Sequence, residues 1–146
     1  MKRRSILITA VILAACAGAK SGAGPAPKAT ANPAIINGRD IFTTGRDIDG
    51  VKVTASPAPL RPSCAACHRV DGSGGVHLPG GAVSADLRHK ALVNGQKIPY
   101  TVALLERALA TGVDNTGEKL NRVMPHWHMS QRDLHDVAEY VLTQLH

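Results

Sequence analysis

The most informative stretch of this chain is Cys64-Ala65-Ala66-Cys67-His68. Its two thiols and its imidazole stand at positions i, i+3 and i+4, which lie on one face of a helical turn. Two cysteines at this spacing, followed at once by a histidine, form the attachment signature of c-type haem. The spacing therefore predicts one covalent haem c, with Cys64 and Cys67 bonded to the porphyrin edge and His68 as the proximal iron ligand.

A thioredoxin-like redox pair or half of a zinc site is the alternative for the same cysteines. A zinc site needs two further ligands at a matching spacing, and the chain has only three cysteines. A redox pair usually opens a long helix, whereas Gly72, Gly74 and Gly75 follow closely here and disfavour one. Covalent haem therefore matches the sequence better than either alternative.

The second axial ligand of the iron must come from elsewhere in the chain. Beyond Met1, methionine occurs only at positions 124 and 129. Met129 directly precedes the expected last helix, so it can pack on Leu134 as a hydrophobic staple. Met124 lies in a loop that Pro125 stiffens, and it is the predicted distal ligand.

Two alternatives remain for that sixth iron position. One is a bis-histidine site through His126 or His128, and the other is an iron left open or weakly bound. Solvent exposure is the expectation for every histidine except His68, namely His77, His89, His126, His128, His135 and His146.

The first 15 residues are interpreted as a signal peptide of the lipoprotein type. A basic start at 1–4 precedes a short apolar stretch at 5–15, which is too short to span a bilayer. The sequence Leu-Ala-Ala-Cys at 13–16 resembles the bacterial lipoprotein signal, in which Cys16 is lipidated and becomes the first residue. An ordinary signal peptide cut near an Ala-x-Ala-like site is the alternative.

The rest of the chain divides into a tether and one domain. Residues 17–31 consist of small and polar residues that cannot form a core, so 16–31 are expected to be the lipidated cysteine and a flexible tether. Residues 32–146 then form a single domain of ordinary size. The net charge of +6 is mild and no aromatic-interleaved basic patch accompanies it, so nucleic-acid binding is not expected.

Helix signals stand at both ends of this domain. Asn32 is a good N-cap and Pro33 suits the first helical position of a helix that Gly45 ends. Ser130 can cap a last helix, with Asp133 at the capping-box position. Its apolar stripe consists of Leu134, Val137, Ala138, Val141, Leu142 and Leu145.

Two further helices are expected between them. Thr101 can cap a helix over 102–110, with Gly112 beyond its end, and a short helix is expected over 85–93. The only β-like piece is 51–53, so the fold class is all-α. Aromatic residues make up only 3% of the chain, and a haem macrocycle would supply the bulk that large rings usually provide.

Three motifs in order give the domain its resemblance to a family. They are Gly38-Arg39-Asp40-Ile41-Phe42; then Cys64-Ala65-Ala66-Cys67-His68 with Arg69-Val70-Asp71-Gly72; then Gly112-Val113-Asp114, Met124-Pro125-His126-Trp127 and the helix through Tyr140. The set resembles the class I (mitochondrial-like) cytochromes c, specifically the small bacterial periplasmic members. That resemblance implies three to five helices wrapped around one covalent haem.

The resemblance also implies individual contacts. The first and last helices should cross at Gly38, beside Phe42 and Tyr140. The carbonyl of Pro79 should accept the N–H of the proximal histidine and fix its ring. The segment 45–62 departs from the family, because it forms a long loop insertion before the haem motif. The partner-binding surface of the family therefore does not carry over to this chain.

A one-electron carrier is the function expected from these features, because His/Met ligation leaves no iron position for a substrate. The alternative is the cytochrome subunit of a membrane or periplasmic oxidoreductase. A haem enzyme or gas sensor would require an open sixth site. The expected partners are a donor and an acceptor protein for a monomeric, non-enzymatic domain, held by its lipid on the periplasmic side of a bacterial membrane.

Overall fold

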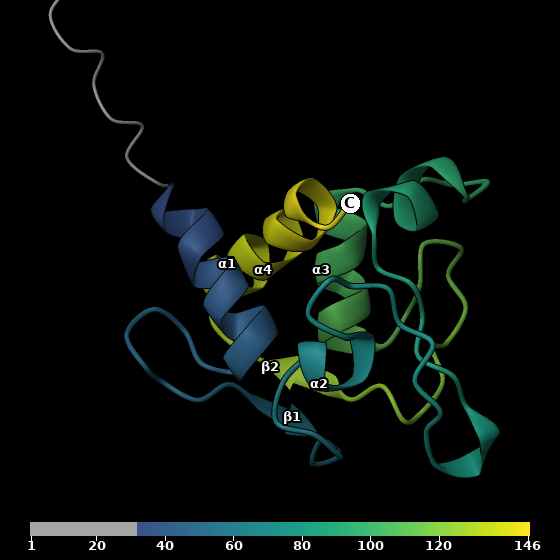
Figure 1. Ribbon diagram of the computed structural model, residues 1–146, viewed down its shortest axis with the longest axis horizontal. Coiled ribbons are helices and arrows are strands. Elements are labelled where there is room, and N and C mark those ends of the chain that lie inside the picture. The colour runs from purple at the N-terminus through teal and green to yellow at the C-terminus, as the bar shows by residue number, and fades with distance from the viewer. Residues whose placement is uncertain (1–31) are drawn as a thin grey trace, which may run out of the picture. The chain divides into compact units, whose positions relative to one another are not determined.

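The computed structural model describes residues 32–146, so the expected signal peptide, Cys16 and tether lie outside the described residues. Among residues 32–146, no helix is long and apolar enough to cross a bilayer. The elements in chain order are α1 (Pro33–Thr44), β1 (Thr54–Ser56), α2 (Ala65–His68), the 3-10 turn η1 (Pro79–Gly81), the π-helical turn η2 (Lys90–Asn94), α3 (Val102–Thr111), β2 (His126–His128) and α4 (Gln131–Gln144) (Figure 1). The fold is the mainly helical one that the sequence predicted.

The predicted caps of the three long helices are present. Asn32 accepts from the N–H of Ala34 at the start of α1, and Thr101 accepts from Leu104 at the start of α3. Ser130 accepts from the N–H of Asp133 at the start of α4. Each bond satisfies a backbone donor that would otherwise lack a partner.

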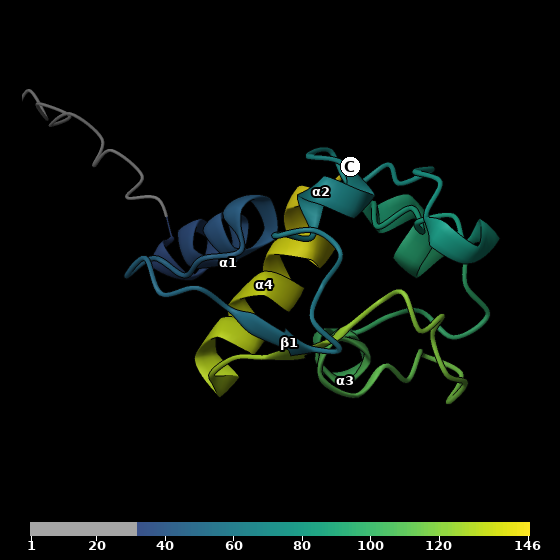
Figure 2. The same cartoon turned by 90° about the horizontal axis from the view of Figure 1, so that it is seen from below.

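Helices α1 and α4 cross (Figure 2), and the close contact is at Gly38, as predicted. A Cβ atom at Gly38 would lie 2.1 Å from the carbonyl oxygen of Asp136 and 2.7 Å from Cβ of Tyr140. Only glycine allows the two backbones to approach this closely. The rings of Phe42 and Tyr140 pack beside the crossing, with centroids 5.6 Å apart.

A buried polar bracket ties α1 to α4 next to this crossing. The side chain of Asn37 donates to Oδ1 of Asp133 at 2.9 Å and to Oδ2 of Asp136 at 2.7 Å. Its own oxygen accepts from the N–H of Ile48 at 2.7 Å. One side chain therefore joins α1, α4 and the 45–62 segment.

The structure contains a two-stranded antiparallel sheet, which the sequence analysis did not predict. Thr54 pairs with His128 and Ser56 with His126. The β-like piece predicted at 51–53 instead contributes a backbone bridge between Arg46 and Lys52, which closes a small hairpin. The prediction missed β1 and β2 because each has only three residues and each needs its distant partner.

The helix predicted over 85–93 is wrong in its first half. The N–H groups of Leu87 and His89 donate to the carbonyls of Gly72 and Leu145, far from them in sequence. These bonds remove the donors that a helix would use internally. Only the π-helical turn η2 forms, and Gly95 caps its end.

Candidate haem site

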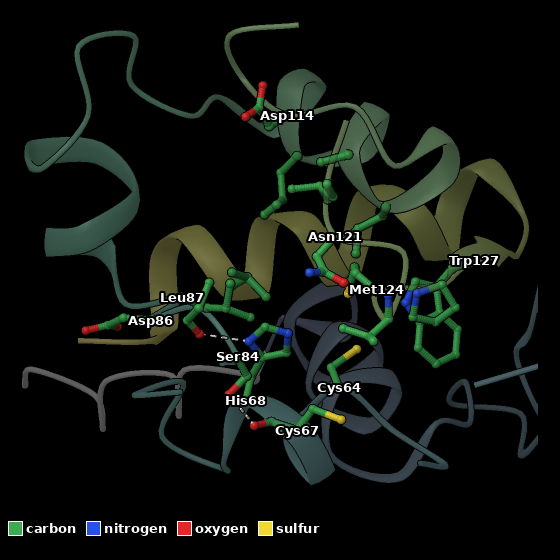
Figure 3. Close-up of a pocket in the computed structure, with 18 of the residues that line it drawn as sticks. Cys64, Cys67, His68, Ser84, Asp86, Leu87, Asp114, Asn121, Met124 and Trp127 are labelled. Atoms are coloured by element: carbon green, nitrogen blue, oxygen red, sulfur yellow. Dashed lines mark hydrogen bonds between the residues drawn. The ribbon is translucent and has the colours of Figure 1, made fainter. Parts of the chain in front are cut away.

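The domain is built around a cavity of about 390 Å³, within the usual size range of ligand pockets. Cys64, Cys67, His68 and Met124 all line it, and Figure 3 shows them gathered at one place. Core side chains from α1, α3 and α4 form the opposite walls. The hydrophobic core of this aromatic-poor domain thus surrounds space for a large ligand.

The two cysteines of the haem motif line this cavity as free side chains. Neither Cys64 nor Cys67 is in a disulfide, and both are half-buried. Burial raises the pKa of the Cys64 thiol to about 12, whereas reactive redox cysteines have a lowered pKa. In the described part of the chain, no three His, Cys, Asp or Glu side chains gather as a metal-ion site. The redox-pair and zinc alternatives are therefore both disfavoured.

The imidazole of His68 is held in the neutral form that an iron ligand requires. Its Nδ1 lies 2.8 Å from the carbonyl oxygen of Ala85, and a carbonyl can only accept, so Nδ1 carries the proton. Burial lowers the pKa of His68, outweighing the opposite effect of this hydrogen bond. Nε2 consequently keeps its lone pair, as a metal ligand must.

The prediction that the carbonyl of Pro79 accepts the Nδ1–H of His68 is wrong. Pro79 begins the exposed turn η1 and does not line the cavity. The acceptor is instead the carbonyl of Ala85, six residues later, in a segment without regular secondary structure. The sequence prediction placed the right kind of bond on the wrong carbonyl.

Neighbouring groups hold this acceptor in place. Ser84 donates through Oγ to the carbonyl of Cys67 at 2.8 Å (Figure 3) and accepts from the N–H of Val76 at 3.0 Å. Gly74 lies so close that a Cβ there would be 2.2 Å from the oxygen of Ala85. The 74–85 loop therefore closes back onto the haem motif.

The two methionines lie in different environments, as the sequence suggested. Met124 lines the cavity, whereas Met129 does not and packs against the edge of the hydrophobic core. His126 and His128 are exposed and do not line the cavity either. They flank Trp127 on β2, and alternation along a strand turns them away from the face that Trp127 buries.

The other histidines are mostly exposed, as expected. His77, His135 and His146 lie at the surface, and Nδ1 of His135 is within hydrogen-bond distance of Oε1 of Glu106, at 2.8 Å. His89 differs, since it is half-buried and its Nδ1 lies 2.9 Å from the carbonyl oxygen of Leu142.

One orphaned polar atom tests whether these residues fit a haem. Trp127 lines the cavity and is 5% exposed, and its indole N–H has no hydrogen-bond partner among residues 32–146. A buried donor without an acceptor is costly. The carboxylates of a bound haem are acceptors of the kind that this N–H lacks. The cavity and its donor set therefore fit the group.

Sequence reasoning missed Ala85, Ser84 and Trp127 as site residues. Ala85 acts through its backbone, so its side-chain identity carries no signal. Trp127 could have been found, because it is the chain's only tryptophan and follows the predicted ligand within three residues.

A mainly helical domain that directs two cysteines and a histidine into one buried cavity is a c-type haem protein. The Cytochrome c family model matches residues 35–144 of the chain. The chain therefore belongs to the cytochrome c family, whose members bind haem c covalently and serve in electron transfer.

Comparisons with individual proteins provide less information than the family model does. No curated protein matches the sequence. Among solved structures, oxidised SHP, an oxygen-binding cytochrome c, is similar with 19% identity and a TM-score of 0.44, over 75% of this chain and 81% of that one.

Proposed function

We propose that this protein is a class I cytochrome c that carries single electrons. The observation behind the proposal is that His68 and Met124 line the same cavity. With both bound, the iron has six ligands and no position for a substrate. The haem supplies a one-electron Fe(III)/Fe(II) couple, and a thioether ligand favours the reduced form.

The protein's own residues set the conditions for this couple. Cys64 and Cys67 hold the haem covalently, and apolar walls exclude water. Burial keeps His68 neutral, and its bond to Ala85 fixes which ring nitrogen carries the proton. An apolar environment of this kind raises the free energy of the oxidised state, because that state carries more charge.

We further propose that Cys16 is lipidated after removal of residues 1–15, so that residues 16–31 tether the domain on the periplasmic side of a bacterial membrane. The sequence at 13–16 supports this. A free carrier and a subunit of a larger oxidoreductase both suit such an anchor.

Carbon monoxide binding tests the carrier proposal against a gas sensor or haem enzyme. With Met124 on the iron, the ferrous protein should bind carbon monoxide slowly and incompletely. Rapid, complete binding would show an open sixth site and contradict the proposal.

A further inference from the structure

Ser84 lies next to the carbonyl that accepts from His68. Its side chain is only 7% exposed and belongs to the wall of the cavity. The following residue, Ala85, supplies the carbonyl oxygen that lies 2.8 Å from Nδ1 of His68. Because Ser84 and Ala85 share a peptide bond, a displacement of Ser84 also displaces this acceptor.

The backbone of Ser84 is fixed by the hairpin that precedes it. Its N–H donates to the carbonyl of Val76 at 3.0 Å, and its own carbonyl accepts from the N–H of Gly75 at 2.9 Å. An antiparallel bridge between His77 and Val83 continues the same pairing. Ser84 therefore ends a hydrogen-bonded hairpin, and the chain then runs directly to the proximal histidine.

The hydroxyl of Ser84 ties this hairpin to the haem motif. Helix α2 is only one turn long, so its last carbonyls have no partner within the helix. Oγ of Ser84 donates to one of them, the carbonyl of Cys67, at 2.8 Å (Figure 3). The same oxygen accepts from the N–H of Val76 at 3.0 Å. One side chain thus supplies a hydrogen bond to each of the two segments.

Two consecutive links therefore join the haem motif to the end of the hairpin. Cys67 is linked to Ser84 through the hydroxyl, and His68 is linked to Ala85 through the imidazole. Gly74 lies against the peptide between Ser84 and Ala85, since its Cβ would be 2.7 Å from the oxygen of Ser84. The position of the Ala85 carbonyl thus depends on Gly74 and on the Ser84 hydroxyl.

We propose that Ser84 is a positioning residue for the iron couple: its hydroxyl holds the Ala85 carbonyl at Nδ1 of His68 and thereby lowers the reduction potential. The inference rests on the proposed ligation of the iron by His68, and Ser84 acts through the Ala85 carbonyl rather than on the iron. A hydrogen bond at Nδ1 makes the imidazole a stronger donor, which stabilises Fe(III). Loss of the hydroxyl loosens this bond and favours Fe(II).

Protein-film voltammetry of the full-length, haem-loaded protein tests this proposal. The variant is Ser84→Ala, which removes both hydrogen bonds of the hydroxyl and keeps the backbone pairing of the hairpin. Its matched control is Ser73→Ala, in the same loop. The hydroxyl of Ser73 donates to Asp71 at 2.8 Å, and among residues 32–146 it makes no hydrogen bond to Cys67 or Ala85.

Ser84→Ala should shift the redox equilibrium toward Fe(II) by about threefold to tenfold, as expected for the loss of one hydrogen bond, while Ser73→Ala leaves it unchanged. NMR of the ferrous protein gives a second readout. The Nδ1 proton of His68 should exchange with water about tenfold faster in Ser84→Ala. Ser84→Thr keeps a hydroxyl and should restore both values. Should Ser84→Ala lose its haem, Ser84→Cys is the second variant, because a thiol is a weaker donor and should give a smaller shift of the same sign.

An unchanged potential in Ser84→Ala would overturn the proposal, since the hydroxyl would then serve stability alone. Equal shifts in Ser84→Ala and Ser73→Ala would also overturn it, because loosening of the loop would explain both. Carbon monoxide binding separates these outcomes from failure of the carrier function. A wild type that binds carbon monoxide rapidly contradicts only the carrier function, because a shift of the potential by Ser84→Ala can still be measured on a haem with an open sixth position.

Discussion

Nδ1 of His68 lies 2.8 Å from the carbonyl oxygen of Ala85, and this contact ties the predicted proximal iron ligand to a loop 17 residues further along the chain. A hydrogen bond at this nitrogen fixes the ring and makes the imidazole a stronger electron donor to the iron. The same carbonyl is the atom that a side chain at Gly74 would strike.

Gly74→Ala should therefore change the haem and not only the fold. A Cβ at this position would lie 2.2 Å from the Ala85 oxygen, so the carbonyl must move away from His68. The weakened imidazole donor favours Fe(II), so the reduction potential should rise. The free energy of unfolding should fall by about 1–3 kcal/mol. Protein-film voltammetry and denaturant unfolding measure the two effects.

Gly75→Ala is the matched control. Gly75 has φ +74 against +62 at Gly74, but a Cβ there meets nothing within 4 Å. It should lower stability through backbone strain and leave the potential unchanged. Equal shifts of potential in both variants would mean that the Ala85 contact does not act on the iron.

Covalent attachment requires both thiols at the cavity. Cys64→Ser or Cys67→Ser should each reduce the yield of holoprotein sharply, whereas Ala66→Ser keeps both thiols and should keep the haem. Haem staining of denaturing gels measures this. Extraction of the wild-type haem into acid acetone would contradict a covalent bond.

Lipidation should be found at Cys16 and nowhere else. Mass spectrometry of the native protein is expected to show an acylated Cys16 as the first residue. Cys16→Ser should release the protein from the membrane fraction with an unchanged haem spectrum, because the lipid lies outside the haem-binding domain. A mature protein without acyl mass, beginning at Ala17 or later, would point to an ordinary signal peptide.

The Asn37 bracket should give the fold a pH dependence. Burial favours the neutral form of Asp133, but hydrogen bonds from Ser130, Asn37 and Arg132 outweigh it and hold the pKa below the ordinary 3.8. A carboxyl with a lowered folded-state pKa adds stability that is complete above the unfolded pKa and is lost as the pH falls through the folded one.

Asn37→Ala should lower the free energy of unfolding at pH 7 by about 1–3 kcal/mol. Loss of one donor also raises the pKa of Asp133 toward its ordinary value, so the loss of stability between pH 5 and pH 2 becomes shallower. Denaturant unfolding across this pH range measures both. Asn94→Ala, at an exposed position, is the control, and parallel pH curves for wild type and Asn37→Ala would argue against the bracket.

The features that the sequence predicted well are local ones. The caps at Asn32, Thr101 and Ser130 lie within three residues of the groups that they satisfy. The haem motif is likewise complete within one helical turn. Local spacing is therefore enough to locate these elements and to pair thiols with the ligand histidine.

The features that the sequence did not predict depend on backbone contacts between residues far apart in the chain. The pairing of Thr54 with His128 joins segments 74 residues apart, and neither strand is long enough to show a pattern. The acceptor for His68 is a backbone carbonyl, which every residue has, so no side chain distinguishes Ala85 from Pro79. Only the path of the folded chain selects one of them.

Whether Met124 binds the haem iron distinguishes an electron carrier from a catalyst. The near-infrared spectrum of the ferric protein, compared with those of Met124→Ala and Met129→Leu, tests its role most directly. A bond between sulfur and iron(III) gives a weak band there. Wild type and Met129→Leu should both show it, because Met129 does not line the cavity, while Met124→Ala should lack it. Retention of the band by Met124→Ala, or its absence from wild type, would contradict ligation by Met124.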